Sequence, residues 1–245
     1  MKNSLPSLIP FRKGDKWGFC NLQKVIVIPV KYDEVGSFVE EAVRVRLGEK
    51  WGFIDSQGKE ITSTRYDEVE DFHNGFARVN FGIKKNDHTT IFPGKWGVVD
   101  KTGKEIIPVQ YSEIGEFLDG LFPVKLNDKW GLLNTTAHPV VQIKYDAIGE
   151  LKEDYLPVKE KGKWGFINKK GEKVIPENFD DVGSFTEGIT YVKLNDWWGL
   201  IDKSGRGITP IKYDQIGKIK NGLISVKING KWGFIDRYGA EYFED

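Results

Sequence analysis

Few residues in this sequence could support metal or nucleophile chemistry. The three histidines, His73, His88 and His138, are not spaced with one another or with the single Cys20 as the ligands of a zinc site would be. The sequence also lacks a phosphate-binding loop, a Gly-x-Ser-x-Gly turn and a dinucleotide fingerprint. We therefore expect no catalytic residue, no metal and no cofactor, and a protein that is not an enzyme.

Charged residues recur at regular intervals and could serve acid-base chemistry or anion binding. Adjacent acids such as Asp33-Glu34 and Asp67-Glu68 could act as a pair, but they recur along the chain, whereas one active site needs one pair. A recurring set of cations could likewise form a stripe that binds an anionic ligand, or each cation could pair with a nearby carboxylate. We expect the pairing, because a matching set of acids cancels the field at a distance. The cations are Arg12, Arg46, Lys125, Lys159, Lys193 and Lys227, and the acids are Asp33, Asp67, Asp146, Asp180 and Asp214.

A tandem repeat positions these charges. The dipeptide Trp-Gly occurs seven times, and successive tryptophans are 34 residues apart except for one interval of 45. A fixed period in this range indicates stacked units, because each unit is too small to bury its apolar face alone. We number each repeat from its tryptophan, which is position 0. The seven are Trp17, Trp51, Trp96, Trp130, Trp164, Trp198 and Trp232.

Each repeat has the pattern of an antiparallel meander of strands. Apolar residues at positions 0, 2 and 3 are typical of a strand buried on both faces, and the segment from −8 to −4 alternates with the period of a strand. Asp or Asn at position 4 and Gly at position 7 in five repeats indicate a turn, after which an apolar pair at 10 and 11 predicts another strand. No segment has a helical period. The sequence predicts an all-β fold of seven tandem meanders.

The tryptophans are expected to form a buried structural core, since each precedes a run of apolar residues. Cys20 occupies a position that is otherwise Ile, Val or Leu, so a packed core thiol is expected. Trp197 stands where six repeats have Lys, and we expect it to be exposed. The alternative for the tryptophan series is a stacking platform for sugars or bases.

The columns Lys-Trp-Gly-Phe-Ile-Asp, Gly-Lys-Glu and Tyr-Asp, as in residues 50–55, 58–60 and 66–67, resemble the bacterial WG-repeat (KWG) family over essentially the whole chain. The resemblance implies a β-rich repeat, with no activity, cofactor or catalytic residue to carry over. We expect residues 1–245 to form a single array. The columns fit a β-propeller of seven blades, which we favour, or an open β-solenoid. The departures from the pattern are Lys24, Ala137, Ser112 and Trp197.

The interval of 45 residues contains 11 extra residues within 81–92. Apolar and β-branched residues flank a polar tip there, which predicts one hairpin longer than its counterparts. A projecting hairpin is a natural place for partner binding, and a tolerated surface insertion is the alternative. The candidate binding residues are Ile83, Lys84, Lys85, Asp87, His88, Ile91, Phe92 and, in another repeat, Trp197.

These features predict a non-enzymatic scaffold for protein–protein interaction. The alternatives are a carbohydrate or cell-wall module that uses exposed aromatics such as Trp197, Tyr191 or Phe92, and an enzyme with a site in a central channel. Lys plus Arg equals Asp plus Glu at 36 each, so no net field favours nucleic acid or a membrane surface. The sequence has neither a signal-peptide pattern nor an apolar run long enough to span a bilayer, and we expect a cytoplasmic protein.

Overall fold

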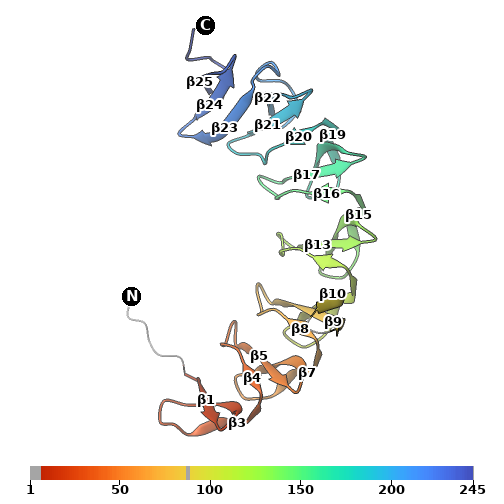
Figure 1. The fold of residues 1–245 in the computed structure, drawn as a ribbon, viewed down its shortest axis with the longest axis vertical. Coiled ribbons are helices and arrows are strands. Elements are labelled where there is room, and N and C mark those ends of the chain that lie inside the picture. Colours follow the sequence, from red (N-terminus) through yellow and green to blue (C-terminus); the bar gives the residue numbers. More distant parts are fainter. Residues whose placement is uncertain (1–6, 87–88, 245) are drawn as a thin grey trace. The chain divides into compact units, whose positions relative to one another are not determined.

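The computed structural model describes residues 7–86 and 89–244. For residues 84–86 and 89–91 it describes the backbone alone. Every helix-or-strand element in these ranges is a β-strand, so the described chain contains no helix that could cross a membrane. The contacts divide the chain into an N-terminal part, Met1–Asn127 with Leu133–His138, and a C-terminal part, Asp128–Leu132 with Pro139–Asp245. Within each part the sheets follow one another in chain order (Figure 1).

The first three sheets are formed by β1 to β3, β4 to β7 and β8 to β11, with antiparallel pairing between neighbouring strands. The bounds are β1 (Ile9–Lys13), β2 (Lys16–Cys20), β3 (Ile26–Tyr32), β4 (Glu34–Val35), β5 (Ala42–Leu47), β6 (Lys50–Asp55), β7 (Glu60–Tyr66), β8 (Glu68–Val69), β9 (Phe76–Asn86), β10 (Thr89–Asp100) and β11 (Glu105–Tyr111). In these three sheets the Trp-Gly pairs lie on β2, β6 and β10, each of which has a neighbouring strand on both sides.

Four further sheets follow, formed by β12 to β15, β16 to β19, β20 to β22 and β23 to β25. The bounds are β12 (Glu113–Ile114), β13 (Leu121–Leu126), β14 (Lys129–Asn134), β15 (Pro139–Tyr145), β16 (Ala147–Ile148), β17 (Tyr155–Glu160), β18 (Lys163–Asn168), β19 (Lys173–Phe179), β20 (Asp181–Val182), β21 (Ile189–Leu194), β22 (Trp197–Asp202), β23 (Gln215–Lys220), β24 (Leu223–Ile228) and β25 (Lys231–Asp236). The expected all-β fold of seven tandem antiparallel meanders is confirmed. Both a propeller and a solenoid are built from such sheets.

The hydrophobic core lies between successive sheets. Residues at positions 2, 11 and 15 of one repeat pack against residues at −8, −6 and 3 of the next, because positions 2 and 3 point to opposite faces of their strand. The first such cluster contains Phe19, Ile28, Tyr32, Val43, Val45 and Ile54. Position 2 is no more than 1% exposed in the first six repeats, so each sheet between two others is buried on both faces.

The turn at positions 4 to 7 follows the expected chemistry. In repeat 2, the carboxylate of Asp55 accepts hydrogen bonds from the backbone N–H groups of Gln57 and Lys59, both at 2.9 Å. Gly58 completes the turn with a φ of +78°. Lys24 and Ala137 take the equivalent position in repeats 1 and 4 with φ of 61° and 60°, so the turn is kept where the glycine is not.

The tryptophans are not the buried ladder that we expected. The six in repeats 1 to 6 are half-buried, and Trp232 is 59% exposed. Each lies toward one end of its strand, beside the residues at −5 and 15; Trp51, for example, pairs with Arg46 and Tyr66. Their rings therefore border the core instead of filling it. The core residues that recur are those at positions 2 and 3, the Phe-Ile of Trp-Gly-Phe-Ile. Cys20 is buried, as expected.

Candidate functional site

The lysine at position −1 and the aspartate at position 16 form a recurring tie between repeats. The carboxylate of Asp33 accepts hydrogen bonds from Lys16 Nζ at 2.5 Å and, in the next repeat, from the N–H of Gly48 at 2.7 Å. These two bonds hold the pKa of Asp33 below its ordinary value. The other such ion pairs are Lys50 with Asp67, Lys129 with Asp146, and Lys163 with Asp180.

The cations at position −5 lie opposite the tryptophan of their own repeat in the antiparallel register. Some of them pair with a nearby carboxylate, as expected, such as Lys125 with Glu113 and Lys193 with Asp196. The guanidinium of Arg46 lies 5.8 Å from the centre of the Trp51 ring and also pairs with Glu34 at 3.0 Å. Further stacked pairs include Arg12 with Trp17, Lys159 with Trp164, and Lys193 with Trp198.

Repeat 3 lacks both the residue pair that forms the ion pair between positions −1 and 16 and the cation at −5 that lies over the tryptophan. Asn80 replaces the cation at −5 and pairs across the hairpin with Trp96, while Ser112 replaces the aspartate at 16. Within residues 7–86 and 89–244, excluding the side chains of 84–91, Lys95 at position −1 forms no ion pair and no cation covers the Trp96 ring. The sequence pattern identified Ser112 but not Asn80. Positions are counted from Trp96, and the insertion lies between Asn80 and Trp96, so Asn80 does not fall at −5 by counting.

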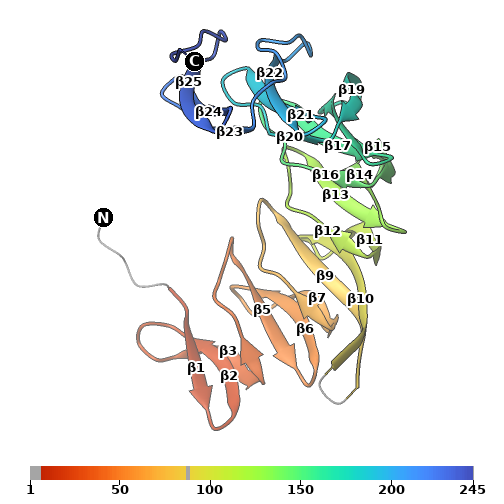
Figure 2. The same ribbon diagram turned by 45° about the horizontal axis from the view of Figure 1, so that its top comes forward.

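The insertion lengthens the hairpin of β9 and β10, as expected. It replaces the two-residue turn at positions −3 and −2, and the strands remain paired beyond it, with Ile83 opposite Pro93 and Lys84 opposite Phe92 (Figure 2). Asp67 anchors the base of the hairpin, since its carboxylate accepts hydrogen bonds from the N–H of Gly82 at 2.6 Å and of Ile83 at 3.1 Å. Partial burial raises the pKa of Asp67, but these bonds and the Lys50 ion pair lower it overall.

The structure places the candidate binding residues as follows. Ile83 is half-buried at the base of the hairpin, and Phe92 is 41% exposed on β10. Lys84 and Lys85 belong to β9 and Ile91 to β10, but their side chains lie outside the described residues, as do Asp87 and His88 entirely. Trp197 begins β22 in the C-terminal part and is 45% exposed, as expected.

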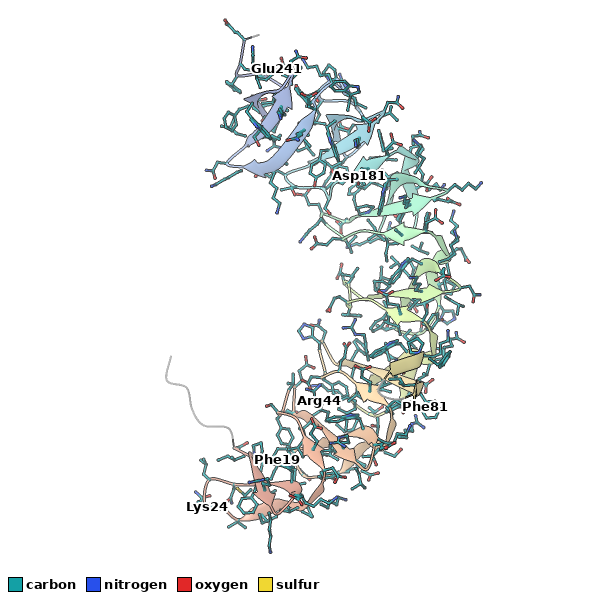
Figure 3. The ribbon with its side chains drawn as sticks, in the orientation of Figure 1. Phe19, Lys24, Arg44, Phe81, Asp181 and Glu241 are labelled. Carbon is teal, nitrogen blue, oxygen red and sulfur yellow. The ribbon has the colours of Figure 1, made fainter. Side chains whose placement is uncertain are left out.

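Two hollows flank the base of the hairpin. One, of about 390 Å³, is lined by Arg65, Tyr66, Phe81, Lys95, Glu105 and Val109. The other, of about 530 Å³, is lined by Arg46, Glu49, Trp51, Asp67 and Ile83. Phe81 is 53% exposed and lies at the surface of its sheet (Figure 3). Sequence reasoning included the hairpin but missed Phe81 and Lys95, which become neighbours only through the strand register.

The described side chains of this surface offer charged and apolar groups for binding. Within the described residues, no group of three or more His, Cys, Asp or Glu is placed to hold a metal ion. The fold and the repeated ties between sheets define the protein as an all-β tandem-repeat protein.

The chain belongs to the WG containing repeat family. The family model matches residues 17–51, 51–82, 96–130, 130–164, 164–196 and 198–232, which together make up most of the sequence. No curated protein is significantly similar to the chain.

Solved structures that the chain resembles have low identity. A eukaryotic initiation factor is 12% identical with a TM-score of 0.41, over 97% of this chain and 72% of that one. Hsv2p of Kluyveromyces lactis is 9% identical with a TM-score of 0.39, over 80% and 71%. The extracellular domain of a putative hybrid two-component system from B. thetaiotaomicron is 12% identical with a TM-score of 0.37, over 98% and 40%.

Trp197 provides a test of the tie between repeats. The aspartate at position 16 of other repeats accepts one bond from the lysine at −1 and one from a backbone N–H of the next repeat. Because Trp197 replaces that lysine, Asp214 makes only the second of these bonds, with the N–H of Gly230 at 3.1 Å. The Trp197→Lys variant should restore the ion pair and raise the free energy of unfolding by up to about 1 kcal/mol, measured by urea denaturation. Trp197→Gln, which removes the exposed ring without adding charge, is the control. Equal stability of the two variants would show that the ion pair contributes nothing here.

Proposed function

We propose that this protein is a non-enzymatic scaffold that binds another protein through the surface around the base of the β9–β10 hairpin. The observation that carries the proposal is the coincidence of three departures in repeat 3: Asn80 at −5, Ser112 at 16, and the insertion between them. Each departs from an arrangement that recurs in other repeats. Stacking does not require these departures, whereas a binding surface would benefit from the groups they leave uncovered.

The chemistry of this surface favours a protein partner. Phe81 and Phe92 are 53% and 41% exposed, and charged side chains surround the hollow beside Phe81. An aromatic anchor inside a polar rim is the usual composition of a protein-binding hot spot. The projecting strands also allow contact without rearrangement of the stacked sheets.

The test replaces residues 82–94 with the Gly-Glu turn of repeat 2. The other repeats stack with two-residue turns, so the variant should fold, as checked by circular dichroism and thermal melting. Affinity capture from the native host followed by mass spectrometry should then lose the partner that the unaltered protein retains. A matched control, Trp197→Ala, removes an exposed aromatic in another repeat and should retain the partner. Loss of the partner by the control alone would place the binding surface on repeat 6 and contradict the proposal.

A further inference from the structure

Lys95 is a lysine whose usual carboxylate partner has been removed. In four other repeats the lysine at −1 pairs with the aspartate at 16, as Lys163 does with Asp180. In repeat 3 the residue at 16 is Ser112, whose hydroxyl donates a hydrogen bond to the carbonyl of Lys125 at 3.0 Å. Among the described side chains, Lys95 therefore has no carboxylate to neutralise its charge.

The other charges around the 390 Å³ hollow have partners within the protein. The guanidinium of Arg65 donates a hydrogen bond to the hydroxyl of Tyr66 at 2.7 Å and lies 3.9 Å from the carboxylate of Glu105. Glu105 also accepts a hydrogen bond from the N–H of Val109 at 3.0 Å. Among the described side chains, Lys95 is thus the charge without a partner of opposite sign in the hollow, whose apolar lining comes from Phe81, Tyr66 and Val109.

We infer that this hollow binds an Asp or Glu side chain of the partner protein together with an adjacent apolar residue. The carboxylate pairs with Lys95 Nζ, and the apolar side chain packs against Phe81 and Val109. The inference rests on the proposed function, since it names the chemistry of the partner at the same surface. The equivalent lysines already bind carboxylates in this protein.

The first measurement uses two dipeptide probes. The full-length protein, labelled with ¹⁵N, is titrated by NMR with acetyl-Asp-Phe-amide and with acetyl-Asn-Phe-amide, which has the same shape without the charge. The Asp probe should bind with a Kd in the millimolar range and shift the amide signals of Phe81 and Lys95, and the Asn probe should bind at least about fivefold more weakly. Equal affinity for the two probes, or no shift at about 10 mM of either, would overturn the inference.

Ser112→Asp separates this inference from a general effect on folding. The introduced carboxylate should capture the ammonium of Lys95 as the aspartates of other repeats do, preserving the melting temperature while weakening binding of the Asp probe about fivefold to tenfold. Lys95→Met should weaken binding similarly, and the matched control Lys163→Met should not. Unchanged affinity of the Ser112→Asp protein for the Asp probe would contradict the carboxylate site. If that variant also retains the captured partner while hairpin replacement loses it, the proposed function stands and only the carboxylate inference fails.

Discussion

Truncation of Phe166 to alanine is expected to lower the free energy of unfolding by about 3–5 kcal/mol. Phe166 is at position 2 of repeat 5 and is fully buried. Its ring lies 4.9 Å from that of Phe185, and both belong to a cluster that includes Val192 and Ile201 of the next repeat. Alanine would leave a cavity between two sheets, whose backbones are held apart by the surrounding side chains. Urea denaturation monitored by circular dichroism measures the loss.

Phe234→Ala is the matched control, because Phe234 has the same position in repeat 7 and is 51% exposed. Its truncation should cost no more than about 1 kcal/mol, since the side chain is already largely exposed to solvent. Trp164→Ala should give an intermediate loss, as the Trp164 ring is half-buried at the margin of the same core. If Phe166→Ala were no more destabilising than Phe234→Ala, position 2 would not form the core between repeats.

The strands and turns could be predicted from the sequence because they depend on neighbouring residues. The alternation before each tryptophan and the Asx turn after it act within about eight residues, and the structure has both. The longer hairpin could be predicted for the same reason, since a local excess of residues between two strand patterns can only extend their turn. Trp197 was correctly expected to be exposed from its place in a lysine column.

The burial of particular aromatics could not be predicted in this way. Alternation places Trp164 and Phe166 on the same face, but only the neighbouring sheet determines which of the two it covers. The pairing of charges depends likewise on register, which sets Lys159 opposite Trp164 and brings Lys163 to Asp180 across 17 residues. The candidate site was incomplete because Phe81 and Lys95 are separated in sequence by the insertion and meet only across the hairpin.

The second large effect is expected for Gly103→Ala, at about 2–4 kcal/mol. Gly103 has a φ of +81°, a conformation that costs an alanine about 1–2 kcal/mol. A Cβ atom there would also overlap the carbonyl oxygen of Ile61 in the preceding repeat, so the two sheets must separate or the turn must shift. Repeat 4 shows that such a shift is possible, since Ala137 occupies the same position with a φ of 60°. This relaxation sets the lower end of the expected range.

Gly120→Ala distinguishes the two contributions. Gly120 has a φ of +88°, but a Cβ atom there would meet no other atom within 4 Å, so only the conformational cost of about 1–2 kcal/mol applies. The excess loss for Gly103→Ala therefore measures the close approach of one repeat to the next. Equal losses for the two variants, measured by urea denaturation, would show that the junction accepts a methyl group freely and that backbone conformation alone selects glycine at position 7.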